Sequence, residues 1–159
     1  MALTLREAQA ADTSLILRLV RDLAVYEKLA HEVKASEDDI RRDLFGAQPR
    51  VFCDIAEWNG EAVGFALWYY TFSTFEGRHG IWLEDLFVEP AARGRGIGKA
   101  LLVHLARRCV REGLTRFEWA VLDWNEPSLE FYRRQGARPM AEWERFRLDG
   151  EALARLGAP

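Results

Sequence analysis

A glycine-rich turn past the middle of the chain carries the clearest chemical signal. Glycines alternate with other residues at positions 94, 96 and 98, after a strand pattern and before a helix pattern. Glycine permits tight backbone curvature and has no Cβ to block a ligand, so that successive N–H groups can converge on a phosphate at the positive end of a helix. Arg93, Arg95 and Lys99 add positive charge beside the turn. The segment therefore predicts a pyrophosphate site.

The spacing of the turn argues against two common phosphate-binding motifs. A nucleotide-triphosphatase loop needs glycine at position 93 and Ser or Thr at position 100, where this chain has Arg93 and Ala100. The dinucleotide fingerprint has a different glycine spacing and lies in a first βαβ unit. Spacing alone leaves a plain glycine turn as the alternative to a phosphate site.

The turn resembles the acetyl-CoA motif of the GNAT superfamily of N-acetyltransferases, through Arg93-x-x-Gly96-x-Gly98 after a strand that ends at Val88. Further segments are similar, in order and spacing, to motifs of the spermidine/spermine (diamine) and thialysine acetyltransferase branch. They are Tyr26-Glu27, Trp82-Leu83-Glu84-Asp85, Asp123-Trp124-Asn125-Glu126-Pro127-Ser128 and Phe131-Tyr132. The resemblance covers nearly the whole chain and implies an acetyl-CoA-dependent N-acetyltransferase that acts on a primary amine.

The resemblance also implies a fold and a cofactor site. The fold is an α/β (α+β) single domain, in which a mixed, mostly antiparallel sheet opens at the cofactor site and carries helices on both faces. A bulge in the strand before the turn would free backbone groups for the pantetheine amides. For Asn125, a helix cap with proline in the first turn is an alternative that can coexist with ligand binding. The implied cofactor-binding residues are Leu86, Phe87, Val88, Arg93, Gly94, Arg95, Gly96, Ile97, Gly98, Lys99, Asn125 and Ser128.

Amine acetylation requires a base and an acid. An alkyl ammonium has a reference pKa of about 10.4 and must lose a proton before it attacks a thioester. By family position, Tyr132 is the predicted acid for the leaving thiolate, although a lone helix aromatic more often packs in a core. Glu84 is the predicted base, through water, and is also predicted to hold the ammonium. Burial of a carboxylate within an apolar strand is costly and therefore indicates a function. Strand alternation predicts that Glu84 and Asp85 face opposite ways and form no carboxylate pair.

The amine site is expected to be anionic and aromatic. Glu27 follows the first helix beside Tyr26 and would hold the cation together with Glu84, while Trp119 would wall the cleft. A solvated helix-end charge is the alternative for Glu27. We predict no metal, because the cysteines and histidines are not spaced as ligands.

The substrate is left open between two classes of amine. In polyamine acetyltransferases the loop before the Glu84 strand carries an acidic residue and a tryptophan. Here residues 72–78 are closer to the thialysine type, with Phe75 at the aromatic position. A diamine or polyamine and a thialysine- or lysine-like amino acid are both candidates. The alternatives are acetylation of a protein lysine or N-terminus and a non-catalytic acyl-CoA-binding regulatory module, which the presence of both Tyr132 and Glu84 argues against.

Hydrophobic periodicity and turn signals predict the element order β-α-α-β-β-β-α-β-α-β-β. A capped helix begins at Ser36, and Asn59-Gly60 joins two strands as a hairpin. On the helix after the glycine-rich turn, His104 lies away from the apolar line and is predicted to be solvated. The predicted strands are residues 3–6, 50–57, 61–70, 80–88, 116–122, 138–142 and 144–148, the last two as a final hairpin.

Composition limits the remaining possibilities. The 159 residues fit one domain, 1–159, with a sizeable core, and the net charge of −3 gives no sign of a nucleic-acid or anionic-membrane binder. Cys53 and Cys109 are predicted to be reduced core thiols. The N-terminus lacks a signal-peptide pattern, and no stretch approaches the roughly 20 apolar residues of a membrane span. We expect a cytoplasmic protein, and the resemblance implies a homodimer.

Overall fold

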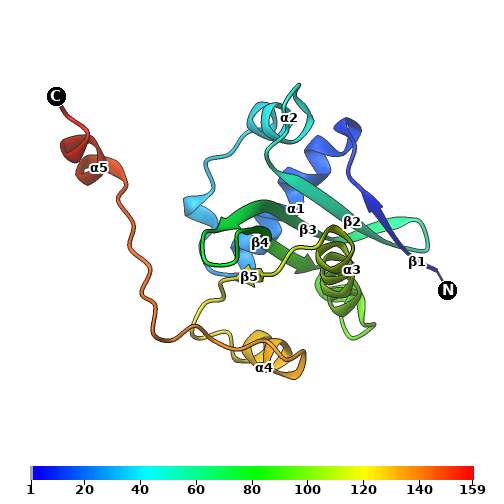
Figure 1. The fold of residues 1–159 in the computed structure, drawn as a ribbon. Helices are drawn as coiled ribbons and strands as arrows, with labels where there is room; N and C mark the ends of the chain where they lie inside the picture. Colours follow the sequence, from blue (N-terminus) through cyan, green and yellow to red (C-terminus); the bar gives the residue numbers. More distant parts are fainter. Residues whose placement is uncertain (1) are drawn as a thin grey trace. The chain divides into compact units, whose positions relative to one another are not determined.

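The computed structural model describes residues 2–159, which form two compact units, one up to Ala120 and one from Val121 onward. The first unit is built on a five-stranded sheet (Figure 1). Its main elements are β1 (Leu3–Glu7), α1 (Thr13–Tyr26), α2 (Glu37–Phe45), β2 (Phe52–Trp58), β3 (Glu61–Ser73), β4 (Arg78–Val88), α3 (Ile97–Glu112) and β5 (Phe117–Trp119). The second unit contains α4 (Glu126–Arg134) and α5 (Gly150–Leu156). A single acetyltransferase domain over 1–159 stays a prediction.

The sheet has the mixed, mostly antiparallel topology that the sequence predicts. Its strand order is β1-β2-β3-β4-β5; the first four strands pair antiparallel, and β5 runs parallel to β4. Asn59 and Gly60 form the predicted hairpin turn, with φ angles of 53° and 86°. Positive φ at both central residues matches the twist of the flanking strands, and Asn-Gly is the sequence that best tolerates it.

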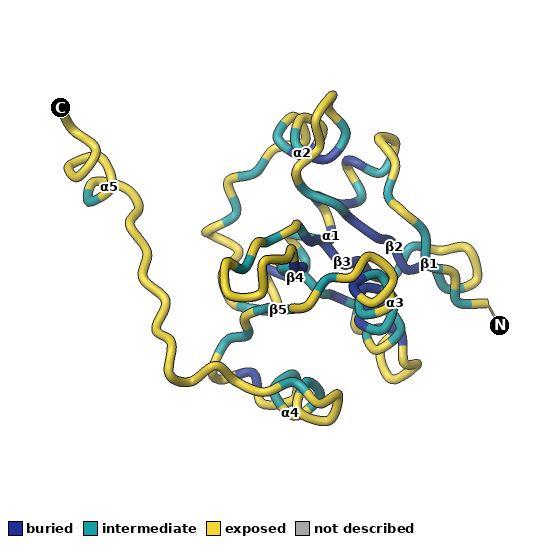
Figure 2. Tube along the Cα trace, viewed as in Figure 1, coloured by how far each residue is buried: buried dark blue, intermediate teal, exposed yellow. Residues whose placement is uncertain are grey.

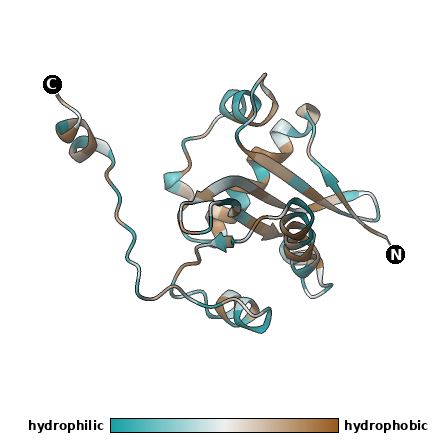
Figure 3. Ribbon diagram, in the orientation of Figure 1, coloured by the Kyte–Doolittle hydropathy of each residue, from teal (hydrophilic) through white to brown (hydrophobic). Residues whose placement is uncertain are grey.

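Helices cover both faces of the sheet. Successive strand residues point to opposite faces, so that Cys53 and Ile55 of β2 join a core with α1 and α2, whereas Asp54 faces α3. Figure 2 shows much of β2 and β3 and part of α1 as buried, and Figure 3 shows β2 as largely hydrophobic. Both cysteines are buried free thiols, as predicted. The helical residues of this core are Ile16, Leu17, Leu19, Leu23, Ile40 and Leu44.

A buried carboxylate lies between β2 and α3. Asp54 is 1% exposed; its Oδ2 accepts a hydrogen bond from Trp68 Nε1 at 2.9 Å, and its Oδ1 lies 3.2 Å from Nε2 of His104. The prediction that His104 is solvated is therefore wrong. A buried acid needs hydrogen-bond partners, and the imidazole supplies one of them.

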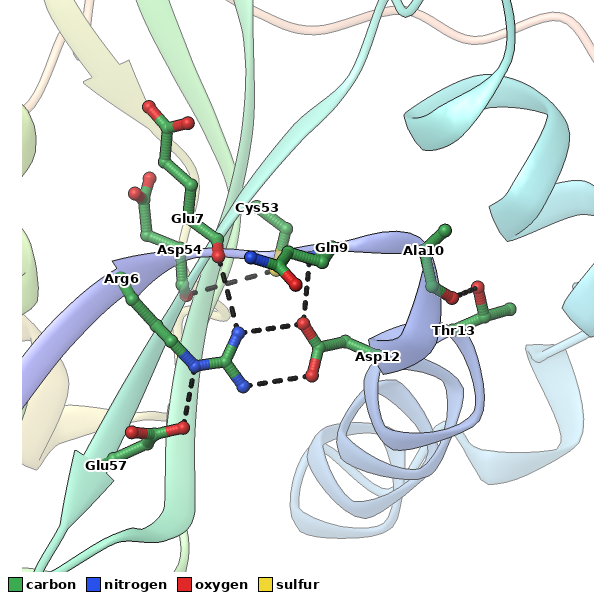
Figure 4. Close-up of polar contacts among 9 residues, drawn as sticks. All are labelled: Arg6, Glu7, Gln9, Ala10, Asp12, Thr13, Cys53, Asp54 and Glu57. Atoms are coloured by element: carbon green, nitrogen blue, oxygen red, sulfur yellow. Dashed lines mark hydrogen bonds and ion pairs between the residues drawn. The ribbon is translucent and has the colours of Figure 1, made fainter.

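The start of α1 is fixed to the sheet by an arginine (Figure 4). Arg6 of β1 donates to both carboxylate oxygens of Asp12, at 2.8 and 2.9 Å, and to Glu57 of β2 at 2.6 Å. The paired guanidinium lowers the pKa of Asp12. This bidentate contact links the first two strands to the helix that ends near the candidate site.

The second half of the chain departs from the predicted elements. The strand expected at residues 116–122 is shorter, Phe117–Trp119, and the final hairpin predicted at 138–142 and 144–148 is absent from the described residues. Residues 138–149 instead form irregular backbone before α5, a helix that the sequence analysis did not predict. Within residues 2–159, no helix is long and apolar enough to cross a membrane.

Candidate functional site

A β-bulge in β4 determines the direction of the acidic side chains at the centre of the site. Leu83 pairs with Trp68 and Asp85 pairs with Leu67, so that Glu84 is an extra residue without an opposite partner. An extra residue interrupts strand alternation and re-aims a side chain. The prediction that Glu84 and Asp85 face opposite ways is therefore wrong.

The two acids instead belong to one face of the sheet. Asp85 and Phe87 are two residues apart in β4, so their side chains point to the same face of the sheet, where Phe87 packs in the core with α1. Glu84 accepts a hydrogen bond from Trp82 Nε1 at 2.9 Å, and Trp82 lies opposite Tyr69, on the same side of β3 as Leu67. The bulge thus directs the carboxylates of two consecutive residues, Glu84 and Asp85, to the same face of the sheet.

A third acid comes from the end of α1. Burial and the negative charge of Glu84 raise the pKa of Glu27. Burial and the charges of Glu84 and Glu27 raise the pKa of Asp85 to about 7. A negative charge raises the pKa of another acid only when the two lie close together, so the structure brings together Glu27 and Glu84, which were both predicted for the amine site, and adds Asp85. We call Glu27, Glu84 and Asp85 the acidic set.

Asp85 is the site residue that the sequence analysis missed. The argument that a carboxylate within an apolar strand indicates a function applies to Asp85 as well as to Glu84. Family position selected Glu84, and strand alternation placed Asp85 on the opposite face, an inference that only the bulge corrects. A group with a pKa near neutrality can exchange a proton at physiological pH.

The sheet opens next to the acidic set. In the described part of the chain, β5 pairs with β4 only through Ile81, Trp82 and Leu83. Residues 85–88 pair with β3 on one side, and none of residues 84–88 pairs with a described strand on the other. Leu86, Phe87 and Val88 therefore lie along a free strand edge, as predicted, although the bulge itself lies at Glu84. Trp119 pairs with Leu83 where this edge begins.

The glycine-rich loop joins β4 to α3. Gly94 and Gly96 have φ angles of 76° and 75°, and a Cβ built on either would meet no atom within 4 Å. Gly96 is the N-cap of α3, so the amides of the helix's first turn lack intrahelical acceptors. An open turn of left-handed glycines at a helix N-terminus fits a diphosphate. The predicted residues Ile97, Gly98 and Lys99 form that first turn.

Arg93 connects this loop to the end of α1. Its Nε donates to the Val88 carbonyl at 2.8 Å, and its guanidinium lies 4.9 Å from the Tyr26 ring centroid and 5.5 Å from that of Phe87. A cavity of about 540 Å³ lies here. It is lined by Asp22, Val25, Tyr26, Phe87, Glu89, Pro90, Ala91 and Arg93.

The second unit carries the remaining predicted residues. Asn125 is 5% exposed and occupies the N-cap position of α4, and Pro127 lies in the first turn as predicted. The Asn125 side chain does not make the capping hydrogen bond, so capping alone does not account for a buried amide. Ser128 and Tyr132 follow on α4, where Tyr132 is half-buried and its ring centroid lies 5.4 Å from that of Phe131.

Comparison with known proteins gives the family. Residues 16–137 match the family model described as the acetyltransferase (GNAT) family. The chain belongs to this family. It is therefore an acetyltransferase, as the motifs predicted. Within residues 2–159, no cluster of three or more acids, histidines or cysteines is arranged to hold a metal ion.

Relatives of this acetyltransferase match almost its whole length. It is 42% identical to thialysine N-epsilon-acetyltransferase of Sus scrofa, over 96% of this chain and 95% of that protein. It is 33% identical to spermidine/spermine N(1)-acetyltransferase-like protein 1 of Homo sapiens, over 94% of this chain and 23% of that protein. The structure of an integron cassette protein from the mobile metagenome of V. cholerae superposes with a TM-score of 0.83 at 26% identity, covering 100% of this chain and 99% of the other.

Proposed function

We propose that this acetyltransferase transfers an acetyl group from acetyl-CoA to a primary amine of a small cationic substrate by direct attack. The observation that carries the proposal is the acidic set at the free edge of β4. Carboxylates attract an ammonium, and a free strand edge can pair with an amide-bearing arm. The similarity to thialysine and spermidine/spermine acetyltransferases supports a thialysine- or lysine-like amino acid and a diamine or polyamine as the candidate amines.

The cofactor part of the proposal assigns acetyl-CoA to the loop and the free edge. Acetyl-CoA would supply an activated thioester. Gly94 to Lys99 would bind its diphosphate through backbone amides, with Arg95 and Lys99 adding positive charge. Leu86, Phe87 and Val88 would pair with the pantetheine amides, and Asn125 and Ser128 of the second unit would contact the same arm. No metal takes part.

The acidic set would prepare the amine. Glu27 holds the cation, while Asp85 directly, or Glu84 through water, accepts the ammonium proton. The free amine nitrogen then bonds to the thioester carbonyl carbon, the C–S bond breaks, and its electron pair leaves on sulfur. The nitrogen, which is cationic after the attack, would lose its second proton to solvent to give the neutral amide. Tyr132 would donate its proton to the departing sulfur and be reprotonated by solvent. Tyr26 and Trp119 would form the aromatic walls of the amine site.

A thiol-release assay tests the proposal. Purified protein with acetyl-CoA is offered spermidine, a short diamine, thialysine, lysine and a lysine-containing peptide, and free CoA thiol is measured. We expect release with at least one small amine and little with the peptide. Release with the peptide alone would support acetylation of protein lysines. Tight acetyl-CoA binding without release across the panel would support a non-catalytic acyl-CoA-binding module.

We further propose that the enzyme is a cytoplasmic homodimer, as the family resemblance implies. Light scattering coupled to gel filtration should give twice the 18.3 kDa chain mass. A monomeric mass in an active preparation would contradict the dimer. Cell fractionation of the native host tests the cytoplasmic location, and recovery with the membrane fraction would contradict it.

A further inference from the structure

Both arginines of the glycine-rich loop rest on aromatic rings. Arg93 lies over Tyr26 at 4.9 Å, inside the candidate site. The guanidinium of Arg95 lies 5.2 Å from the centroid of the Trp58 ring, on a different part of the fold. A cation at this distance from an indole face is attracted by the ring quadrupole, and tryptophan is the strongest of the aromatic acceptors.

Trp58 stands on a rigid support. It is the last residue of β2, and it pairs with Leu3 of β1 on one side and Glu61 of β3 on the other. The following Asn59 is held as well: its N–H donates to the Ala2 carbonyl at 3.0 Å, and its Oδ1 accepts from the Ala2 N–H at 3.2 Å. A half-buried indole on a strand paired on both sides has few conformations to lose.

Arg95, in contrast, belongs to a segment with much backbone freedom. It lies between Gly94 and Gly96, both left-handed and both in open space. Glycine loses more conformational entropy on ordering than any other residue. A ligand that needs the loop in one conformation must offset this loss, and a contact that orders the loop beforehand improves affinity.

The faces of the sheet explain why the two residues meet. Trp58 has the same parity on β2 as Asp54, which contacts His104 of α3. Trp58 therefore lies on the face that carries α3, whose N-cap is Gly96. On this face the Trp58 indole contacts Arg95 of the loop, whereas Arg93 of the loop contacts Tyr26 of α1.

We propose that Trp58 is a positioning residue for acetyl-CoA: through its stacking on Arg95 it holds the glycine-rich loop in the conformation that binds the diphosphate. The proposal rests on the function proposed above. An exposed cation–π contact corresponds to about a two- to fivefold change in an equilibrium constant. The effect belongs to cofactor affinity, because Trp58 carries no group of the acetyl transfer itself.

A different role for Arg95 makes the opposite prediction. If Arg95 acts by leaving Trp58 to contact a phosphate directly, the indole competes with the cofactor for the guanidinium. Removal of the ring would then leave acetyl-CoA affinity unchanged or improve it. The sign of the Trp58 effect therefore separates the two roles.

The test is a double-mutant cycle on CoA affinity, measured by titration calorimetry at fixed ionic strength with Trp58→Leu, Arg95→Met and the double variant. We expect each single change to weaken binding, Trp58→Leu by about two- to fivefold, and the double variant to bind no worse than Arg95→Met. Trp58→Phe, which keeps a weaker aromatic face, should fall between wild type and Trp58→Leu, and it replaces Trp58→Leu if that variant does not fold. Arg107→Met, a change at an exposed arginine of α3, the helix that follows the loop, is the control for loss of a positive charge.

Kinetics complete the test. The KM for acetyl-CoA should rise in Trp58→Leu with kcat and the amine KM unchanged, a pattern that general destabilisation would not give. Unchanged or tighter CoA binding in Trp58→Leu, or losses that simply add in the double variant, would overturn the proposal. If wild type itself does not bind CoA, or if Gly96→Val binds it as well as wild type, the loop is not the cofactor site and the proposed function fails instead.

Discussion

Replacement of Asp85 by asparagine should change how the stability of the protein depends on pH. Burial next to Glu84 and Glu27 raises the pKa of the Asp85 carboxyl in the folded protein to about 7, from its ordinary value of 3.8. An acid with a raised pKa favours the folded state while it is protonated. The contribution of Asp85 to the free energy of unfolding is fully present below pH 3.8 and is lost as the pH rises through about 7.

The magnitude follows from the two pKa values. They differ by about three pH units, and each unit corresponds to about 1.4 kcal/mol, which gives at most about 4 kcal/mol. Part of this loss occurs below pH 4.5, and solvent screening of a half-buried group reduces it further, so we expect Asp85→Asn to remove about 2–3 kcal/mol of the stability lost between pH 4.5 and pH 8. The variant should thus gain stability relative to wild type as the pH rises.

Urea denaturation at pH 4.5, 6, 7 and 8 measures the effect in wild type and variant. Asp38→Asn is the matched control, because it makes the same chemical change on a side chain that is 91% exposed. Parallel stability curves for wild type and Asp85→Asn would refute the reasoning, since they would show that Asp85 titrates alike in the folded and unfolded protein. A cationic amine should also stabilise wild type more at pH 8 than at pH 6, because Asp85 is ionised there.

The other predictions concern turnover and binding. Tyr132→Phe should lower kcat by about 10²- to 10⁴-fold with CoA affinity unchanged in calorimetry; an unaltered kcat would remove the phenol from the mechanism. Glu27→Gln should raise the amine KM about tenfold and leave the acetyl-CoA KM alone, and an unaffected amine KM would exclude Glu27 from the amine site. In wild type, kcat/KM for the amine should increase as the pH rises through about 7 with the ionisation of Asp85; a flat profile over pH 6–8 would contradict its role. Gly96→Ala, at a φ of 75°, should weaken acetyl-CoA binding about five- to thirtyfold, since a left-handed alanine costs about 1–2 kcal/mol; unchanged affinity would count against the loop.

Local signals in the sequence predicted the first unit well. The Asn59-Gly60 turn, the Ser36 capping box and the glycine-rich turn each act within a few residues, and each is present in the structure. The family resemblance predicted the opened sheet. Periodicity failed where a long-range contact determines the environment, as for His104, which contacts an acid 50 residues earlier in the chain.

The acidic set was predicted less completely, because its geometry depends on one irregular residue. A bulge leaves no periodic mark in a sequence, so alternation was applied through Glu84 and separated two carboxylates that belong together. The final hairpin failed for a related reason: short segments at 138–148 with strand-like composition form strands only when a partner strand is available.

The short pairing between β4 and β5 also affects how readily the protein could aggregate. Along residues 84–88, one side of β4 has no described neighbour strand, although the Val88 carbonyl there accepts a hydrogen bond from Arg93. In other proteins such stretches recruit strands from foreign chains and seed aggregates. If CoA binds as proposed, a pantetheine arm paired along this stretch would shield it, and loss of the cofactor would expose this edge to pairing with other chains.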